Sequence, residues 1–357
     1  MSSTQYTMIG LMSGTSGDGL DIAYCSYSLQ DQWSYDILDA ITIPFPEDLG
    51  QKLRNCHKLS ALDLMLLDVD FGKWMGEKVK EYCGEKQITP MAVCSHGHTV
   101  FHQPTKGLSL QIGNGWALHQ GCELRVINDF RMKDVQLGGQ GAPLVPIGDR
   151  LLFPKINFCI NLGGIANISM ESDDKRVAFD TCPFNLLLNE QANAMGADYD
   201  KNGAWAREGQ LDPTLFKALN ALPYYSKSDA KSLGREDLEK EYNPLIRSSG
   251  LSERDILHTL IEHYAFQLAN VIKQHSRLEM PSVLITGGGA YNAYFIERLG
   301  VQLEGKWVNK KATSKLVEFK EALVFGFLGV LRLRNENNCL ATVTGAARDS
   351  SGGVIYG

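Results

Sequence analysis

Each half of the chain opens with apolar strands that a glycine-rich turn interrupts, and this repetition limits the fold more than any other feature. In the first half, the expected strand Thr7 to Met12 breaks at residues 13–19 and resumes as Leu20 to Cys25. In the second half, Asn157 to Leu162 runs directly into Gly163-Gly164. Helical and strand periodicities alternate after each turn, which is typical of α/β folds.

The length allows two such domains, since the chain has 357 residues and a domain takes roughly 150. We expect an N-terminal domain over residues 1–145 and a C-terminal domain over residues 146–357, with a ligand cleft between them. The C-terminal helix is expected to pack back on the first domain. No repeat of 20 to 50 residues indicates a solenoid.

Composition excludes several classes of protein. Hydrophobic residues make up 44% and charged residues 21%, as in ordinary globular proteins, and the net charge of −6 disfavours nucleic acid as a partner. The N-terminus has no charged and apolar leader, and no apolar run is long enough to cross a membrane. The 8 cysteines form no CxxC pair, which predicts reduced thiols. We therefore expect a cytoplasmic protein without a membrane partner.

Asp180 stands at the end of an expected strand, Arg176 to Phe179, just before the helical run Leu186 to Met195. A carboxylate there lies beside a helix N-terminus, where anionic ligands are favoured. Gly163-Gly164 lets the backbone approach a ligand closely. The alternative is structural: a plain hairpin, with Asp180 as a helix cap.

The first glycine turn, SGTSGDG at residues 13–19, carries hydroxyl and N–H donors that suit a phosphate. It is not a Walker loop, because no lysine is present and a strand follows it. A bare hairpin turn is the alternative. Gly287-Gly288-Gly289 lies between an expected strand, Ser282 to Thr286, and an expected helix, Asn292 to Leu299, which is a turn that often contacts nucleotides.

Three further features allow more than one interpretation. His96, His98 and His102 could be metal ligands, although a ligand-contacting loop or a buried histidine also explains them. Arg131 follows a strand, Leu124 to Asn128, and is either an anion or sugar clamp or a surface salt bridge. Glu321 begins an expected helix, where capping is the structural explanation.

Three glycine turns and one strand-end carboxylate suit phosphoryl transfer from a nucleotide. Backbone donors would hold the phosphates, Mg²⁺ would neutralise charge, and the aspartate would take a proton from the attacking group. This arrangement resembles sugar kinases of the actin, hexokinase and heat-shock ATPase superfamily, in which two ribonuclease-H-like domains close over ATP.

A more specific resemblance covers the whole chain. Its motifs look like those of the 1,6-anhydro-N-acetylmuramic acid kinase family, in the family's order. They are IGLMSGTSGDGLD (9–21), SHGHTVFHQP (95–104), LQIG (110–113), DFRMKDVQLGGQGAPLVP (129–146), NLGGIANIS (161–169), FDTCPFN (179–185), YDKNGAWA (199–206), KSLGRE (231–236), TGGGAYN (286–292), EALVFGFL (321–328) and VTGA (343–346).

The resemblance implies a reaction in which ATP phosphorylates O6 of the sugar while water opens its anhydro bridge at C1. Asp180 would be the base that activates water, and Glu321 would orient substrate or water. The resemblance also implies a homodimer. The ATP phosphates, with Mg²⁺ on Asp18, would be held by Gly14, Thr15, Ser16, Gly17, Asp18, Gly19, Leu20 and Asp21. Further contacts to ATP would come from Gly163, Gly164, Gly287, Gly288 and Gly289. The sugar would contact His96, Gly97, Arg131 and Asn185.

The chain departs from the family pattern at several positions. Gly17 replaces a large residue, and His98 replaces the glutamine of SHGQT. Asn114 replaces the aspartate of QIGD, and Asn128 replaces the alanine of ADFR. The changes at His98, Asn114 and Asn128 are expected to alter polar groups near the sugar. The family's DTGPGN is DTCPFN here, and Phe184 in place of glycine could fill space beside Asp180.

These departures leave rival hypotheses. One is a kinase of the same fold that acts on another amino or anhydro sugar. Another is a non-catalytic nucleotide- or sugar-binding protein in which Phe184 blocks the phosphate path. The third is a metal-dependent hydrolase built on His96, His98 and His102, which would need no ATP.

Overall fold

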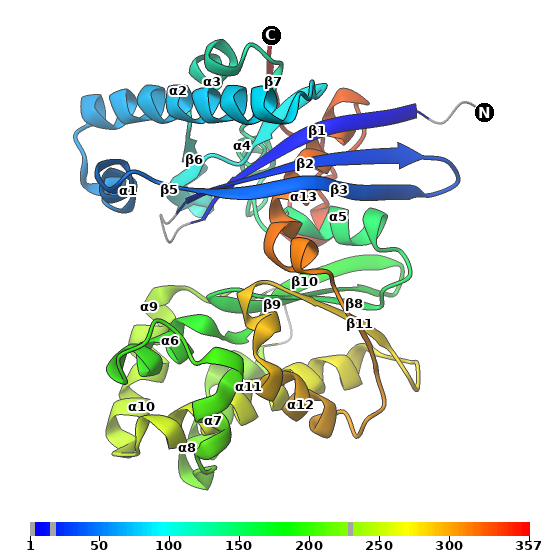
Figure 1. The fold of residues 1–357 in the computed structure, drawn as a ribbon. Helices are drawn as coiled ribbons and strands as arrows, with labels where there is room; N and C mark the ends of the chain where they lie inside the picture. Colours follow the sequence, from blue (N-terminus) through cyan, green and yellow to red (C-terminus); the bar gives the residue numbers. More distant parts are fainter. Residues whose placement is uncertain (1–3, 15–18, 228–230) are drawn as a thin grey trace. The chain divides into compact units, whose positions relative to one another are not determined.

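The computed structural model describes residues 4–14, 19–227 and 231–357. The chain forms two compact units (Figure 1): residues 1–153 with 319–357, and residues 154–318. The expected boundary between residues 145 and 146 falls in the first turn of helix α5 (Val145–Leu152), which the structure keeps whole in the first unit. Helix α13 (Ser314–Leu333) returns the chain to the first unit, so that unit is discontinuous in sequence.

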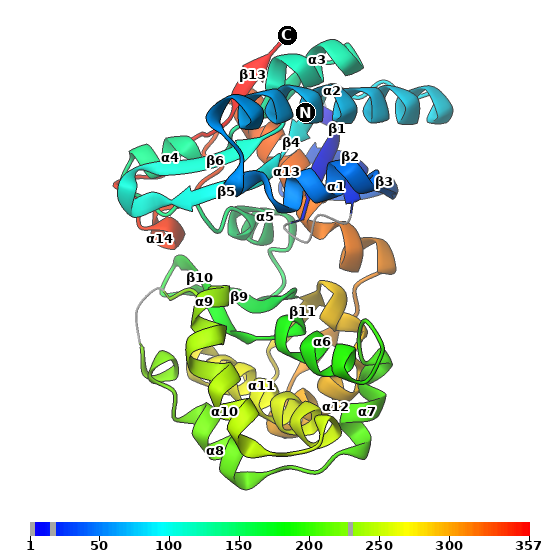
Figure 2. The ribbon, with the colours of Figure 1, turned by 90° about the vertical axis from the view of Figure 1, so that its left-hand side faces the viewer.

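The first unit is built on a sheet with the strand order β13-β7-β4-β1-β2-β3. Strands β1, β2 and β3 pair antiparallel, β4 pairs parallel with β1, and β7 pairs parallel with β4. The strands are β1 (Thr4–Ser13), β2 (Gly19–Leu29), β3 (Trp33–Pro44), β4 (Ala92–Ser95), β7 (Val126–Asn128) and β13 (Val354–Tyr356). A separate hairpin consists of β5 (His98–Gln103) and β6 (Leu108–Ile112), seen in Figure 2.

Helices cover both faces of this sheet. The other helices of the unit are α1 (Glu47–Arg54), α2 (Ala61–Lys86), α3 (Gly115–Cys122), α4 (Met132–Gln136) and α14 (Ala341–Thr344), with short turns η1 (Cys56–Lys58) and η2 (Pro104–Lys106). Helix α2 packs its apolar side, including Phe71 and Met75, on Ile9 and Leu11. Helix α13 packs on the opposite face, where Gly10 lies against the backbone of Ala322. A side chain at position 10 would collide with that backbone.

The second unit repeats the same plan. Its sheet has the order β10-β9-β8-β11-β12, with β8, β9 and β10 antiparallel and β11 and β12 parallel. The strands are β8 (Phe158–Leu162), β9 (Ile165–Ser172), β10 (Lys175–Pro183), β11 (Ser282–Thr286) and β12 (Val308–Lys310). In both sheets the first five strands have the sequence order third, second, first, fourth, fifth, which is the ribonuclease-H-like topology, and β13 adds a sixth, antiparallel strand beside β7 in the first sheet. The predicted α/β fold of two such domains is confirmed.

The helices of the second unit gather mainly on one side of its sheet (Figures 1 and 2). They are α6 (Asn185–Ala194), α7 (Ala204–Glu208), α8 (Pro213–Asn220), α9 (Arg235–Asp237), α10 (Asn243–Ser249), α11 (Glu253–His275) and α12 (Ala293–Gln302). Short turns are η3 (Lys201–Gly203), η4 (Pro223–Ser226), η5 (Leu238–Tyr242) and η6 (Gly288–Tyr291). Helix α11 contributes a buried side that includes Leu260, Tyr264 and Leu268.

Local sequence signals set several of these elements. The side chains of Ser60 and Ser252 accept hydrogen bonds from the N–H groups of Asp63 and Asp255, as expected for helix caps. The capping explanation of Glu321 is wrong, because α13 already begins at Ser314. Among the described residues, no helix is long and apolar enough to cross a membrane.

Candidate active site

Asp180 lies near the end of β10, where a bulge between Asp180 and Cys182 interrupts the pairing with β9. Its side chain is not a helix cap, since Phe184 occupies the N-cap position of α6. Oδ2 accepts a hydrogen bond of 2.9 Å from the N–H of Leu233. Burial raises the pKa of Asp180 to about 6, against the lowering effect of that bond. The carboxylate therefore has the pKa of a general base that works near neutrality.

The turn Gly163-Gly164 sits directly beside the start of helix α6. Its carbonyl oxygens accept hydrogen bonds from the N–H groups of Phe184, Asn185 and Leu186. The helix N-terminus is thus satisfied by the turn and does not present these donors to a ligand, contrary to the expectation of an anion site there. The N–H groups of Gly163 and Gly164 themselves have no acceptor within the described residues.

Gly287-Gly288-Gly289 follows β11 and needs glycine for steric reasons. Gly287 has a φ of +80°, and a Cβ on it would come within 2.6 Å of Asn161 Oδ1. A Cβ on Gly289 would come within 2.4 Å of the Phe184 ring. The backbone here lies close to the end of β8, where Leu162 stands, and glycine is what allows that approach.

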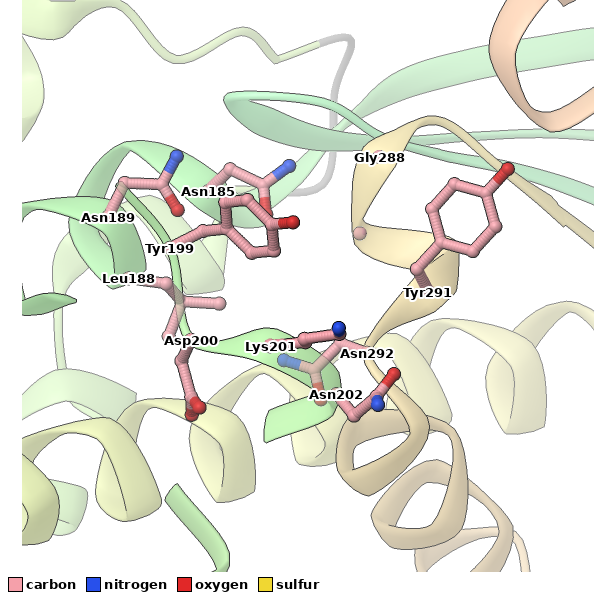
Figure 3. Close-up of a pocket in the computed structure, with 11 residues that line it drawn as sticks. Asn185, Leu188, Asn189, Tyr199, Asp200, Lys201, Asn202, Gly288, Tyr291 and Asn292 are labelled. Carbon is pink, nitrogen blue, oxygen red and sulfur yellow. The ribbon is translucent and has the colours of Figure 1, made fainter. Parts of the chain in front are cut away.

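A cavity of about 450 Å³ opens beside this turn in the second unit (Figure 3). It is lined by Asn185, Leu188, Asn189, Tyr199, Asp200, Lys201, Asn202, Gly288, Gly289, Tyr291 and Asn292. Figure 3 shows Tyr199 on the side of Asn185 and Asn189, and Tyr291 on the side of Gly288. The two tyrosines are 60% and 47% exposed, so their rings are accessible. Asn185, which the family resemblance assigns to the sugar, lines this cavity together with Gly288 and Gly289.

Most residues of this cavity were missed as site residues. Tyr199 to Asn202, Tyr291 and Asn292 stand in the sequence only as parts of two motifs. The available signal was that YDKNGAWA and TGGGAYN both belong to the family-like motifs. Contact between the two segments depends on the fold, since they are far apart in the chain.

Phe184 does not line this cavity. Its side chain is 0% exposed and packs against Phe295 and Tyr264 in the core of the second unit, with ring centroids 4.9 and 5.3 Å apart. Gly289 leaves the space that the ring occupies. The expectation that Phe184 fills space beside Asp180 or blocks the phosphate path is therefore wrong.

In the first unit, the structure brings His96, Arg131 and Glu321 together. Arg131 donates from Nε and Nη2 to His96 Nε2 at 3.1 and 2.9 Å, and from Nη1 to the carbonyl of Gly141 at 2.8 Å. His96 Nδ1 donates to the carbonyl of Gly97 at 2.8 Å. Burial and the neighbouring Arg131 hold the pKa of His96 well below its usual value, so the ring is neutral. Gly97 has a φ of +73° and lies against the Ile112 carbonyl, which excludes a side chain.

Glu321 extends from α13 toward charged groups of this unit. Burial raises its pKa, while Arg131 and Lys320 lower it and Asp21 raises it further. Arg131 also lies 6.0 Å from the centre of the Phe325 ring, one helical turn after Glu321. Arg131 is therefore a positioned guanidinium in a partly buried cluster and not a surface salt bridge.

The histidine cluster does not form a metal centre. His98 Nδ1 bonds to Ser13 Oγ at 3.0 Å, and His102 Nδ1 bonds to Ser109 Oγ at 3.0 Å. His96 uses both ring nitrogens for Gly97 and Arg131. Across the described ranges, no three His, Cys, Asp or Glu side chains are grouped to hold a metal ion. The metal-dependent hydrolase built on these histidines is not supported.

Two departures from the family pattern have structural roles. Asn114 caps α3 through the N–H of Ala117 and donates to Asp68 at 3.1 Å. Asn128 donates to the carbonyl of Gly113 at 3.2 Å. Both side chains therefore hold neighbouring loops, which explains them without a change of substrate.

The first glycine turn is described only at its ends. Gly14 follows the end of β1 and Gly19 begins β2, with Leu20 fully buried. Asp21 Oδ1 accepts a hydrogen bond of 2.6 Å from Thr42 Oγ1. The predicted ATP contacts Thr15, Ser16, Gly17 and Asp18, and the predicted metal ligand Asp18, lie outside the described residues. The predicted antiparallel pair around the turn is confirmed.

Comparison with known proteins gives a consistent result over the whole chain. A family model described as anhydro-N-acetylmuramic acid kinase matches residues 6–357. The protein named anhydro-N-acetylmuramic acid kinase in Sulfurovum sp. (strain NBC37-1) is 33% identical to this chain, and the match covers 98% of each. The protein of that name in Vibrio cholerae is 34% identical over 98% of this chain and 97% of its own.

Solved structures give more distant likenesses. A ROK hexokinase from Thermus thermophilus is 12% identical, covers 91% of this chain and 99% of its own, and has a TM-score of 0.40. The activator of the 2-hydroxyisocaproyl-CoA dehydratase from Clostridium difficile is also 12% identical, covers 93% and 97%, and has a TM-score of 0.40.

Proposed function

The chain belongs to the anhydro-N-acetylmuramic acid kinase family, and we propose that it uses ATP to phosphorylate O6 of 1,6-anhydro-N-acetylmuramic acid while water opens the anhydro bridge. The product is N-acetylmuramic acid 6-phosphate, which belongs to peptidoglycan recycling. Within the structure, the proposal rests on Asp180, a strand-end carboxylate with a pKa raised to about 6. Relatives named for this one sugar match 98% of the chain, so another amino or anhydro sugar is not favoured.

Asp180 is the general base of the proposed reaction. Its carboxylate takes a proton from water, whose oxygen bonds to C1 as the C1–O6 bond breaks. O6 then bonds to the γ-phosphorus of ATP and ADP leaves, so that base catalysis and in-line transfer are combined. The free N–H groups of Gly163 and Gly164 are proposed phosphate contacts in the same unit.

The first unit supplies groups suited to the sugar. Arg131 is held by His96 and Gly141 and retains N–H groups for a carboxylate or hydroxyl, which fits an acidic amino sugar. Glu321 is the proposed group that orients substrate or water. Gly97 is a further proposed contact to the sugar, and it has no side chain that would collide with the Ile112 carbonyl.

Magnesium is the proposed metal, bound mainly through the phosphates of ATP. Mg²⁺ usually takes one or two carboxylates and keeps water and phosphate as its other ligands. A carboxylate at the start of β2, Asp21, fits that requirement beside the glycine turn. When bound, the ion would neutralise charge on the transferring phosphoryl group.

A cytoplasmic homodimer is the proposed state of the protein. All 8 cysteines are free thiols, which suits a reducing compartment. Leu62, Met65 and Leu66 of α2 and Trp116 of α3 are exposed apolar side chains of the first unit. The negative net charge gives no support to a nucleic-acid partner. Sedimentation velocity will test the dimer, which a monomer at micromolar concentration would contradict.

The cavity of the second unit is the proposed nucleoside site, with the Tyr199 ring stacked on the base. Base stacking on an aromatic side chain contributes about 1 to 3 kcal/mol. We expect Tyr199→Ala to raise the KM for ATP roughly tenfold with little change in kcat, while Tyr199→Phe keeps the wild-type KM. Steady-state kinetics with varied ATP will measure both. An unchanged KM in Tyr199→Ala would place the base elsewhere.

Activity is expected to fall on the acidic side of about pH 6. Asp180 must be ionised to accept a proton, and burial raises its pKa to about 6. As the pH falls through that value, the carboxylate is protonated and kcat drops about tenfold per pH unit. The measurement is a profile of kcat between about pH 4.5 and 8, with circular dichroism showing that the protein stays folded. A flat profile down to about pH 5 would contradict Asp180 as the base.

The substrate is tested by ADP release with Mg-ATP and a panel of sugars. We expect release with 1,6-anhydro-N-acetylmuramic acid and a product heavier by one water and one phosphoryl group. If ADP is released only with other sugars, the kinase assignment stands and the proposed substrate is wrong. ATP binding without release with any sugar would favour the binding-protein hypothesis.

A further inference from the structure

Asp180 is held from outside its sheet. Strand β10 is an edge strand, so its outward backbone groups need partners beyond the ladder. The N–H of Asp180 donates to the carbonyl of Lys231 at 3.2 Å. Its carbonyl accepts a hydrogen bond of 2.5 Å from Tyr224 Oη. The N–H and the carbonyl of the proposed base are therefore both fixed by residues some 44 to 51 positions later in the chain, Tyr224 and Lys231.

The side chain of Asp180 is oriented by Leu233, two residues after Lys231. Leu233 N–H donates to Oδ2 at 2.9 Å, whereas Oδ1 has no donor within the part of the chain that the structure describes. The bond from Leu233 thus distinguishes the two carboxylate oxygens. The bulge at Asp180 and Cys182 loosens this strand end, so its geometry depends on the outside contacts.

Tyr224 is itself firmly anchored. Its side chain is 4% exposed, and its ring packs on the Tyr225 ring at a centroid distance of 5.5 Å. Tyr225 Oη donates to His263 Nε2 at 2.8 Å, and His263 Nδ1 donates to Asn220 Oδ1 at 2.9 Å. Tyr242 Oη donates to Tyr225 Oη at 2.7 Å. This buried chain of donors ties η4, and with it Tyr224, to helices α8 and α11.

We propose that Tyr224 is a positioning residue for the proposed base: its hydroxyl fixes the peptide plane of Asp180, so that Oδ2 stays on Leu233 N–H and Oδ1 faces the reacting water. This inference rests on the proposed function only in taking Asp180 as the base. Tyr224 does not act as an acid or base, because burial and the nearby Asp180 carboxylate keep the pKa of its hydroxyl above the usual value.

Other titratable groups near Asp180 do not replace this role. Burial holds the pKa of the Cys182 thiol well above its usual value, so it is neutral. Lys231 places its ammonium 4.8 Å from the centre of the Tyr224 ring and 5.6 Å from that of Phe179. Burial lowers the pKa of Lys231. Its contact with both rings packs Lys231 and Tyr224 against Phe179 of β10.

The test compares Tyr224→Phe with Tyr242→Phe. Tyr224→Phe removes one hydroxyl and its bond to Asp180, and we expect kcat to fall about tenfold, the cost of roughly one good hydrogen bond. The KM values for ATP and sugar should not change. The acidic limb of the pH profile should move to higher pH, because the carboxylate is no longer kept on Leu233 N–H. Tyr242→Phe removes a buried hydroxyl that does not touch Asp180 and should leave the limb in place.

A readout without turnover separates this inference from the proposed function. In protein labelled with ¹³C at aspartate, the Asp180 carboxyl carbon can be titrated by NMR, with its signal assigned from Asp180→Asn. Tyr224→Phe should raise the midpoint, and Tyr242→Phe should not. A wild-type kcat and an unmoved midpoint in Tyr224→Phe would overturn the inference. Absence of sugar turnover in the wild type with a moved midpoint would instead contradict the function alone.

Discussion

Replacement of Asp180 by asparagine is expected to lower kcat about 100- to 10,000-fold, the usual contribution of a general base. Asparagine keeps the shape of the side chain and can still accept the bond from Leu233 N–H. It cannot take a proton from water. Since Asp180 does not line the cavity of the second unit, ADP should bind Asp180→Asn with wild-type affinity in calorimetry.

Asp212→Asn is the matched control for this change. Asp212 caps α8 through the N–H of Leu215 at 2.6 Å, and asparagine caps helices about as well as aspartate. The control should keep kcat and stability near wild type. Near-normal turnover in Asp180→Asn would rule out Asp180 as the base, and loss of ADP binding would point to a folding defect.

Replacement of Phe184 by glycine is expected to destabilise the protein without raising its rate. The ring is fully buried against Phe295 and Tyr264, and removal of such a side chain costs about 3 to 5 kcal/mol of unfolding free energy. Glycine adds about 0.5 to 1 kcal/mol through the greater freedom of the unfolded chain. Urea unfolding followed by circular dichroism will measure the loss.

Phe184→Leu serves as the control, since it keeps much of the apolar volume and should cost less than half as much. Turnover of the folded fraction should be similar in both variants. A stable Phe184→Gly protein with a large gain in kcat would show that the ring obstructs the site after all.

The repeated sheet plan could be predicted because strand periodicity and glycine turns are local signals. Ser60 and Ser252 mark helix starts for the same reason, as each cap involves only neighbouring residues. Asp180 could be identified as a strand-end carboxylate. Its raised pKa and its hydrogen bond to Leu233 could not, because they depend on a segment brought back by the fold.

Other features depended on contacts that the sequence does not display. Phe184 was expected near ligand because it adjoins Asp180, whereas Gly289, far along the chain, provides its place in the core. Helix α13 was expected to begin at Glu321, although Thr313 accepts a bond from Leu316 N–H and marks the earlier start. The return of the C-terminal helix to the first unit agrees with the expectation, but a single boundary at residue 145 does not describe a unit to which residues 319–357 belong.

The most direct measurement is the fate of ¹⁸O from labelled water during turnover with ATP and 1,6-anhydro-N-acetylmuramic acid. If water attacks C1, early samples should contain sugar phosphate with one ¹⁸O on the sugar and none on its phosphoryl group, and ADP without label. N-acetylmuramic acid 6-phosphate kept in the same water for the same time corrects for exchange at C1. Label in inorganic phosphate without labelled sugar phosphate would mean simple ATP hydrolysis and would contradict the account.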